Sequence, residues 1–70
     1  MTDAEFDERV KSFIFEEGRE FRNTKNNCVL RVDRIDEAGV IFFTVFHPKE
    51  VRTGDADKRT LSIIMAAVGY

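Results

Sequence analysis

This chain has few of the residues that carry covalent or metal chemistry, because cysteine and histidine each occur once in 70 residues. A single cysteine excludes an intrachain disulfide and fits a reducing compartment. A metal site would have to be assembled from Cys28, His47 and carboxylates, and the sequence has neither a calcium-binding loop nor a phosphate-binding glycine loop. We therefore expect no metal and no cofactor.

Long apolar runs and targeting signals are also missing. No apolar stretch approaches the roughly 20 residues that a membrane-spanning helix needs. The first residues are acidic and have neither the basic region nor the apolar region of a secretory signal. We expect a cytoplasmic protein that does not engage a membrane.

The length predicts a single domain over residues 1–70. A chain of this size buries only about 60% of the surface that its unfolded form exposes, so its one core gives marginal stability. Without a disulfide or a metal, self-association is the remaining source of stabilisation. We therefore expect a homodimer.

Charge is unevenly distributed within the net charge of -2. Residues 1–20 carry seven acids and three bases, whereas residues 21–34 carry four bases and one acid. The second segment predicts a small basic patch, but an acidic chain as a whole is not typical of nucleic-acid-binding proteins.

A helix is expected over residues 3–16. Apolar residues recur there at helical spacing, and the early acids suit the positive end of a helix. Thr2 or Asp3 is the expected N-cap, and Gly18 is the expected stop. The apolar stripe consists of Phe6, Val10, Phe13 and Ile14.

Three antiparallel strands are expected next, at residues 19–23, 28–35 and 40–47. A polar asparagine cluster predicts the first turn and Gly39 the second, while Pro48 ends the third strand. Ile35 breaks the alternation of its strand, which requires a bulge near Asp33 and Arg34 or a side chain on the opposite face.

The C-terminal third begins with residues 49–57, which are expected to form an exposed connection with, at most, a short extended piece near residues 50–52. Residues 57–68 then predict a helix, with a strand over 59–65 as the alternative. The expected fold is a small α+β domain, in which a three-stranded antiparallel meander packs with two terminal helices (α-β-β-β-α).

The stretch from Val40 to Phe46 is apolar on both parities, although a strand with one wet face should alternate. One explanation is a helix on each face of the sheet. The other is that both helices cover the face of Ile41, Phe43 and Val45, or the reverse, and the second face is left for a partner. Under this hypothesis Phe42, Phe46 and Val40 make contact with the partner, and Arg31 and Arg34 form the polar rim.

Two other kinds of site rank lower. A nucleic-acid surface would use the bases of the first two strands, which are Arg19, Arg22, Lys25, Arg31 and Arg34, with nearby phenylalanines for stacking. Catalysis would need partners for His47 or Cys28, and we interpret these as a hydrogen-bonded strand-end histidine and a packed thiol. Paired carboxylates such as Asp36 and Glu37 are interpreted as turn and capping residues.

Binding is therefore the expected function, with no catalytic residues. We predict a small protein-protein interaction module, a homodimer that acts as an adaptor, regulator or inhibitor of a larger partner. It would work through the face of the strand from Val40 to Phe46 or through the adjacent terminal helix. The ranked alternative is a nucleic-acid-binding module. An enzyme is the third hypothesis.

Overall fold

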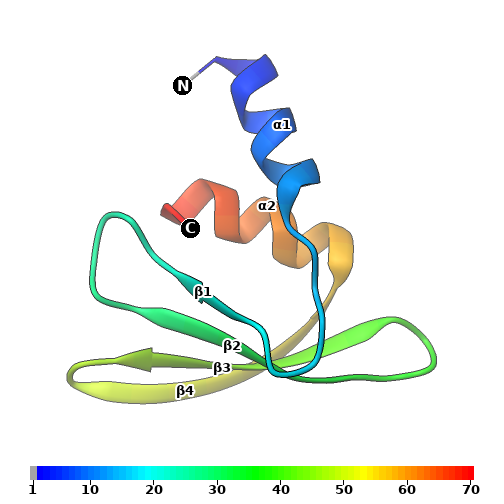
Figure 1. The fold of residues 1–70 in the computed structure, drawn as a ribbon, viewed down its shortest axis with the longest axis vertical. Helices are drawn as coiled ribbons and strands as arrows, with labels where there is room; N and C mark the ends of the chain where they lie inside the picture. The colour runs from blue at the N-terminus through cyan, green and yellow to red at the C-terminus, as the bar shows by residue number, and fades with distance from the viewer. Residues whose placement is uncertain (1) are drawn as a thin grey trace.

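The computed structural model describes residues 2–70 and shows an α+β domain (Figure 1). Along the chain the elements are α1 (Asp3–Ser12), β1 (Glu20–Arg22), β2 (Val29–Ile35), β3 (Val40–His47), β4 (Glu50–Asp57) and α2 (Lys58–Val68). The four strands form one antiparallel sheet in the order β1-β2-β3-β4. The α+β class is confirmed, but the sheet has four strands and not the three expected.

The fourth strand corrects the prediction that residues 49–57 form an exposed connection. Pro48 and Lys49 make a tight turn after β3, and β4 then pairs with β3 along its whole length, from His47–Glu50 to Val40–Asp57. The expected short piece near residues 50–52 is therefore the start of a strand of eight residues. At the opposite edge, β1 is shorter than expected and covers only three residues.

Helix α1 begins as predicted and ends earlier. The Thr2 side chain accepts a hydrogen bond from the Glu5 main-chain N–H and caps the helix. The helix ends at Ser12, whereas the sequence predicted residue 16, and Phe13 is already extended. Phe13 is buried, whereas Ile14 is 57% exposed. Phe13 therefore fits the helical spacing of the apolar residues although it is buried from an extended segment that follows the third turn of the helix.

Helix α2 confirms the helix predicted over residues 57–68, and the alternative strand over 59–65 is wrong. The Asp57 side chain accepts a hydrogen bond from the Thr60 main-chain N–H, and Gly69 ends the helix with a φ of 108°. Within the expected apolar stripe, Leu61 and Met65 are buried, but Ile64 is half exposed.

The core lies between the sheet and the helices. Figure 1 shows both helices on the same side of the sheet, so the arrangement with one helix on each face is wrong. The side chains of β2 and β3 that face the helices are Leu30, Val32, Ile35, Ile41, Phe43 and Val45. They pack against Leu61, Met65 and Ala66 of α2 and against Phe13 and Tyr70, which follow the C-terminal ends of α1 and α2. None of the helices in residues 2–70 is long and apolar enough to span a bilayer.

Candidate functional site

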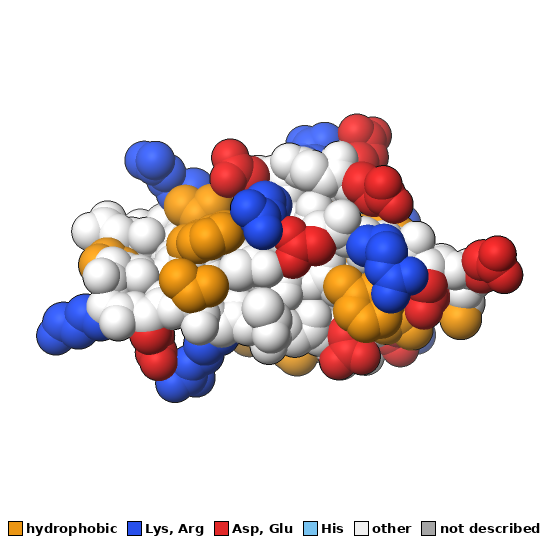
Figure 2. Space-filling view, turned by 90° about the horizontal axis from the view of Figure 1, so that it is seen from below, with side chains coloured by type: hydrophobic (Ala, Val, Ile, Leu, Met, Phe, Trp, Pro, Cys, Tyr) orange, Lys and Arg blue, Asp and Glu red, His pale blue; other side chains and the backbone are white. Residues whose placement is uncertain are grey.

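One face of the sheet carries no helix, and we call it the open face. The strand register places its side chains in rows across the sheet, two of which run from β1 to β4 and two of which begin on β2 or β3. Figure 2 shows this face, where hydrophobic side chains gather in two places separated by polar surface. The rows, from the Pro48 turn toward the Gly39 turn, are Arg22-Val29-Phe46-Val51, Glu20-Arg31-Thr44-Thr53, Arg34-Phe42-Asp55 and Val40-Asp57.

The first row is an apolar strip across three strands. Val29, Phe46 and Val51 stand directly opposite one another on β2, β3 and β4. Cross-strand neighbours on one face are close enough to pack, so the three side chains form one continuous patch. Val51 is 61% exposed, the highest exposed fraction among the large hydrophobic residues within residues 2–70.

A second apolar patch lies toward the other end of the open face. Phe42 and Val40 belong to it, and the guanidinium carbon of Arg34 lies 4.3 Å from the centroid of the Phe42 ring. Arg31 covers Phe46 in the same way at 5.0 Å. Each contact contributes about 0.5–1 kcal/mol at an exposed site. Both phenylalanines are therefore half-buried although no helix covers them.

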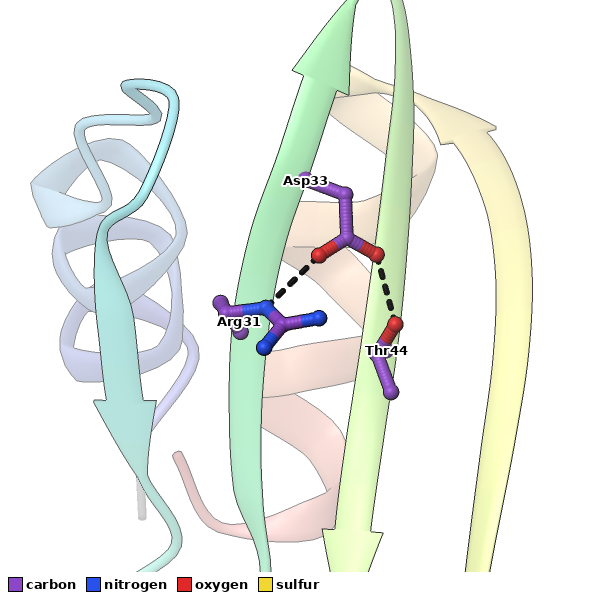
Figure 3. Close-up of polar contacts among 3 residues, drawn as sticks. All are labelled: Arg31, Asp33 and Thr44. Carbon is purple, nitrogen blue, oxygen red and sulfur yellow. Dashed lines mark hydrogen bonds and ion pairs between the residues drawn. The ribbon is translucent and has the colours of Figure 1, made fainter.

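A polar cluster separates the two patches (Figure 3). The Arg31 Nε donates a hydrogen bond to one oxygen of Asp33 at 2.7 Å, and the Thr44 hydroxyl donates to the other at 2.5 Å. The bond from Thr44, followed by the bond from Arg31, stabilises the carboxylate and lowers the pKa of Asp33 below its ordinary value of 3.8. Thr44 is buried beneath this cluster, which holds Arg31 beside Phe46.

A β-bulge makes this arrangement possible. The register shifts between Val32 and Arg34, because Val32 pairs with Phe43 and Arg34 pairs with Phe42. Asp33 is the extra residue, so it and Arg34 both belong to the open face. Ile35 then returns to the helix-facing side and packs against the core, which confirms the bulge alternative for its irregular parity.

The structure brings all five predicted contact residues to the open face. Phe42, Phe46, Val40, Arg31 and Arg34 share it because both helices cover the opposite side. Two further apolar members, Val29 and Val51, were missed. The parity that Val29 shares with Arg31 was a usable signal, whereas Val51 had none because its strand was interpreted as a connection.

The bases expected for nucleic acid are distributed over two sides of the domain. Arg22, Arg31 and Arg34 lie on the open face, where Glu20, Asp33 and Asp55 stand among them. Arg19 lies beside Phe21, whose ring packs against the core. Lys25 lies beside Gly69 at the end of α2.

His47 takes part in a turn hydrogen bond, and Cys28 packs in the core. His47 is exposed, and its Nδ1 accepts a hydrogen bond from the Lys49 main-chain N–H at 3.1 Å. Cys28 is buried in the core, as the packing interpretation predicted. Asp36 accepts hydrogen bonds from the main-chain N–H groups of Ala38 and Val40, so it orders the hairpin turn. Residues 2–70 contain no group of three or more potential metal ligands.

Comparisons with known proteins add no identification. No protein-family model, curated protein or solved structure matches the chain. The assignment of a function therefore depends on the open face and the other surfaces of this domain.

Proposed function

We propose that this chain is a non-catalytic protein-protein interaction module, a homodimer whose open face binds a larger partner. The observation that carries the proposal is the strip of Val29, Phe46 and Val51, which crosses three strands on the face that neither helix covers. Contiguous apolar surface of this kind marks interaction sites on small soluble domains. The module would serve as an adaptor, a regulator or an inhibitor of that partner.

The side chains around the strip indicate which kinds of side chain the partner surface offers. Aromatic and arginine side chains are the types enriched at the energetic centres of interfaces, and Phe42, Phe46, Arg31 and Arg34 supply both. Arg31 is paired with Asp33, but Arg34 has no carboxylate within ion-pair distance among residues 2–70. We therefore expect a partner that offers apolar side chains to the strip and a carboxylate to Arg34.

The test compares proteins retained from an extract of the source cells by immobilised wild type, Phe46→Asp and Ile14→Asp. Ile14 is exposed and lies outside the sheet, so Ile14→Asp introduces the same charge away from the open face. We expect one partner to be retained by wild type and Ile14→Asp and lost by Phe46→Asp. The bound partner should then give a dissociation constant at least about 30-fold weaker for Phe46→Asp.

Other results would count against the proposal. Identical retention by wild type and Phe46→Asp would show that the open face is not the binding surface. Binding of a labelled single-stranded oligonucleotide that weakens steeply with salt and requires Arg22 and Arg31 would favour nucleic acid instead.

A further inference from the structure

The sheet has two edges of different kinds. At one edge β1 is only three residues long, whereas at the other β4 has eight residues, contains no proline and pairs with β3 without a register shift. Short strands, prolines and bulges are means by which proteins prevent an edge from pairing with other chains. The β4 edge has none of the three, and within residues 2–70 β3 is the only strand that pairs with it. In Figure 3 it is the pale yellow strand at the right.

The main-chain groups of β4 point alternately toward β3 and toward the free edge. The Asp36 main-chain N–H donates a hydrogen bond to the Val40 carbonyl at 3.0 Å, so the carbonyl of Val40 points toward β2. These directions alternate along paired antiparallel strands, so the residues of β4 that hydrogen-bond to β3 are 50, 52, 54 and 56. The N–H and C=O groups of Val51, Thr53 and Asp55 therefore point outward. Within residues 2–70 they have no main-chain partner beyond the strand pairs.

The same three residues carry side chains on the open face. Val51 ends the apolar strip at this edge, and its side chain is 61% exposed. Asp55 lies opposite Phe42 and has no base within ion-pair distance among residues 2–70. A hollow of about 490 Å³, lined by side chains that include Phe42, Thr53 and Asp55, leaves room there for a long side chain. An added strand would thus extend the strip at Val51 and meet an unpaired carboxylate at Asp55.

A second copy of β4 is a poor complement of this edge. When two sheets join about a two-fold axis, opposite residues share a face, so odd residues stand opposite odd ones and even opposite even. In the registers that overlap more than half of β4, Arg52 stands opposite itself, Gly54 or Ala56. In the remaining one, Asp55 stands opposite itself. None of these registers pairs an acid with a base, so the charges of the strand select a different chain.

We propose that the β4 edge takes up an extended segment of the larger partner as a fifth strand, with an apolar residue opposite Val51 and a lysine or arginine opposite Asp55. The inference rests on the proposed function and states how the partner binds. Main-chain hydrogen bonds supply the affinity in this mode, and alternate side chains supply the specificity. The added strand is antiparallel, because antiparallel pairing is the more stable per residue.

The first test uses a synthetic peptide with the sequence Lys-Val-Lys-Val-Thr-Glu-Val-Lys, which runs antiparallel to β4 from Asp57 to Glu50. It places valine opposite Val51, threonine opposite Thr53 and lysine opposite Asp55. Titration followed by amide resonances should show saturable binding. Hydrogen exchange at the three outward amides should slow on binding, whereas the amides that already bond to β3 should change little. Absence of saturable binding would overturn the inference.

N-methylation of the peptide separates strand addition from attraction between a basic peptide and an acidic chain. A methyl group on the threonine nitrogen removes the donor to the Thr53 carbonyl and should weaken binding at least about 10-fold. The same change on the preceding valine is the matched control, because that N–H points away from β4 and the affinity should stay within about 2-fold. Equal effects at both positions would contradict the proposed pairing.

Reversal of charge tests the specificity at Asp55. Asp55→Lys should weaken the peptide at least about 5-fold, because it places like charges opposite each other. A peptide with aspartate in place of its second lysine should bind Asp55→Lys better than it binds wild type. Asp7→Lys is the control, since Asp7 is exposed on α1, away from the sheet. An equal loss with both variants would mean that only the overall charge matters.

The retention experiment distinguishes failure of this inference from failure of the proposed function. Thr53→Pro removes an outward N–H and keeps the pairing with β3, and Thr53→Ala is its control. We expect the partner to be lost with Thr53→Pro and kept with Thr53→Ala, with both variants folded by circular dichroism. A partner kept by Thr53→Pro and lost by Phe46→Asp would overturn the added strand and leave the open face as the binding surface.

The free chain provides a last check on the occupant of the edge. The amides of Val51, Thr53 and Asp55 should exchange rapidly in wild type alone at every protein concentration, because nothing within residues 2–70 pairs with them. Protection that grows with protein concentration would show that a second copy occupies the β4 edge. That result would overturn the inference without removing partner binding through the open face.

Discussion

The ring of Phe43 on β3 lies against the main chain of Gly54, the residue directly opposite it on β4. A methyl group at position 54 would lie 2.8 Å from Cζ of that ring, closer than Cβ contacts in proteins. The missing side chain therefore gives the ring its space on the helix-facing side and lets the edge strand pair closely with β3.

Gly54→Ala should lower the free energy of unfolding by about 1–3 kcal/mol, because the added methyl group must push the Phe43 ring or the β4 main chain aside. Urea unfolding followed by circular dichroism measures the change. The double variant Gly54→Ala/Phe43→Leu is the control, since leucine removes the clashing ring edge. It should cost less than the sum of the two single changes. An additive double variant, or a neutral Gly54→Ala, would contradict the packing described.

The same strand shows where sequence patterns fail for this chain. The residues of β4 with strong strand preference are Val51 and Thr53, while Gly54, Asp55 and Asp57 are depleted in strands. Its structure is determined by pairing with β3 at eight positions, which is a tertiary effect. The exposed Val51 could not be assigned to the candidate site because its strand was not expected.

Helix α1 illustrates a second limit. Phe13 fits the helical spacing of Phe6 and Val10, yet it is buried from an extended segment beyond Ser12. The spacing of apolar residues indicates which side chains are buried, but it does not determine the backbone conformation of the segment that carries them. The strand parities of β2 and β3 were more informative, because successive side chains of a strand must take opposite faces. They placed Phe42 and Phe46 on one side of the sheet correctly.

Asn23 connects the β1–β2 turn to the end of α2. It is only 4% exposed, and its Nδ2 donates a hydrogen bond to the Val68 carbonyl at 3.1 Å. Its Oδ1 accepts from the main-chain N–H groups of Lys25 and Asn26. Asn23→Ala should lower the free energy of unfolding by about 1–3 kcal/mol, because it leaves buried polar groups unpaired.

Chemical denaturation of Asn23→Ala and of the matched control Asn27→Ala checks this prediction. Asn27 is exposed, so its substitution should change stability by less than about 0.5 kcal/mol. Asn23→Asp adds a sharper comparison, because it keeps the acceptor oxygen and removes the donor to the Val68 carbonyl. Equal stability of wild type and Asn23→Ala would mean that this connection contributes nothing.

Asp33 should make stability depend on acid pH. Its folded-state pKa lies below 3.8 because the carboxylate accepts hydrogen bonds from Thr44 and Arg31. The folded chain therefore binds fewer protons than the unfolded chain in this range. The stabilisation is fully present above the unfolded pKa and is lost as the pH falls through the folded pKa.

Unfolding of wild type and Asp33→Asn should be compared at about pH 7 and about pH 2. We expect wild type to be the more stable at the higher pH and the difference to become smaller at the lower one. Thr44→Val removes the largest cause of the pKa shift and should reduce the pH dependence that Asp33 contributes. A difference of the same size at both pH values would show that the charge of Asp33 does not matter.

Ile41 and Phe42 are consecutive residues of β3 with opposite surroundings. Ile41 is 1% exposed on the helix-facing side, whereas Phe42 lies on the open face under Arg34. Ile41→Asp should abolish folding, because an unpaired buried carboxylate costs more than about 4 kcal/mol. Phe42→Asp should leave a folded protein that is weakened by about 1–2 kcal/mol, the combined effect of a lost ring contact and a poorer strand former.

Thermal unfolding and the dispersion of amide resonances distinguish the two variants directly. The comparison also tests the register of the whole sheet, because a slip of one residue would exchange the two faces of β3. A folded Ile41→Asp together with an unfolded Phe42→Asp would place Phe42 in the core. The apolar strip would then be part of the core, and the open face would no longer support a binding function.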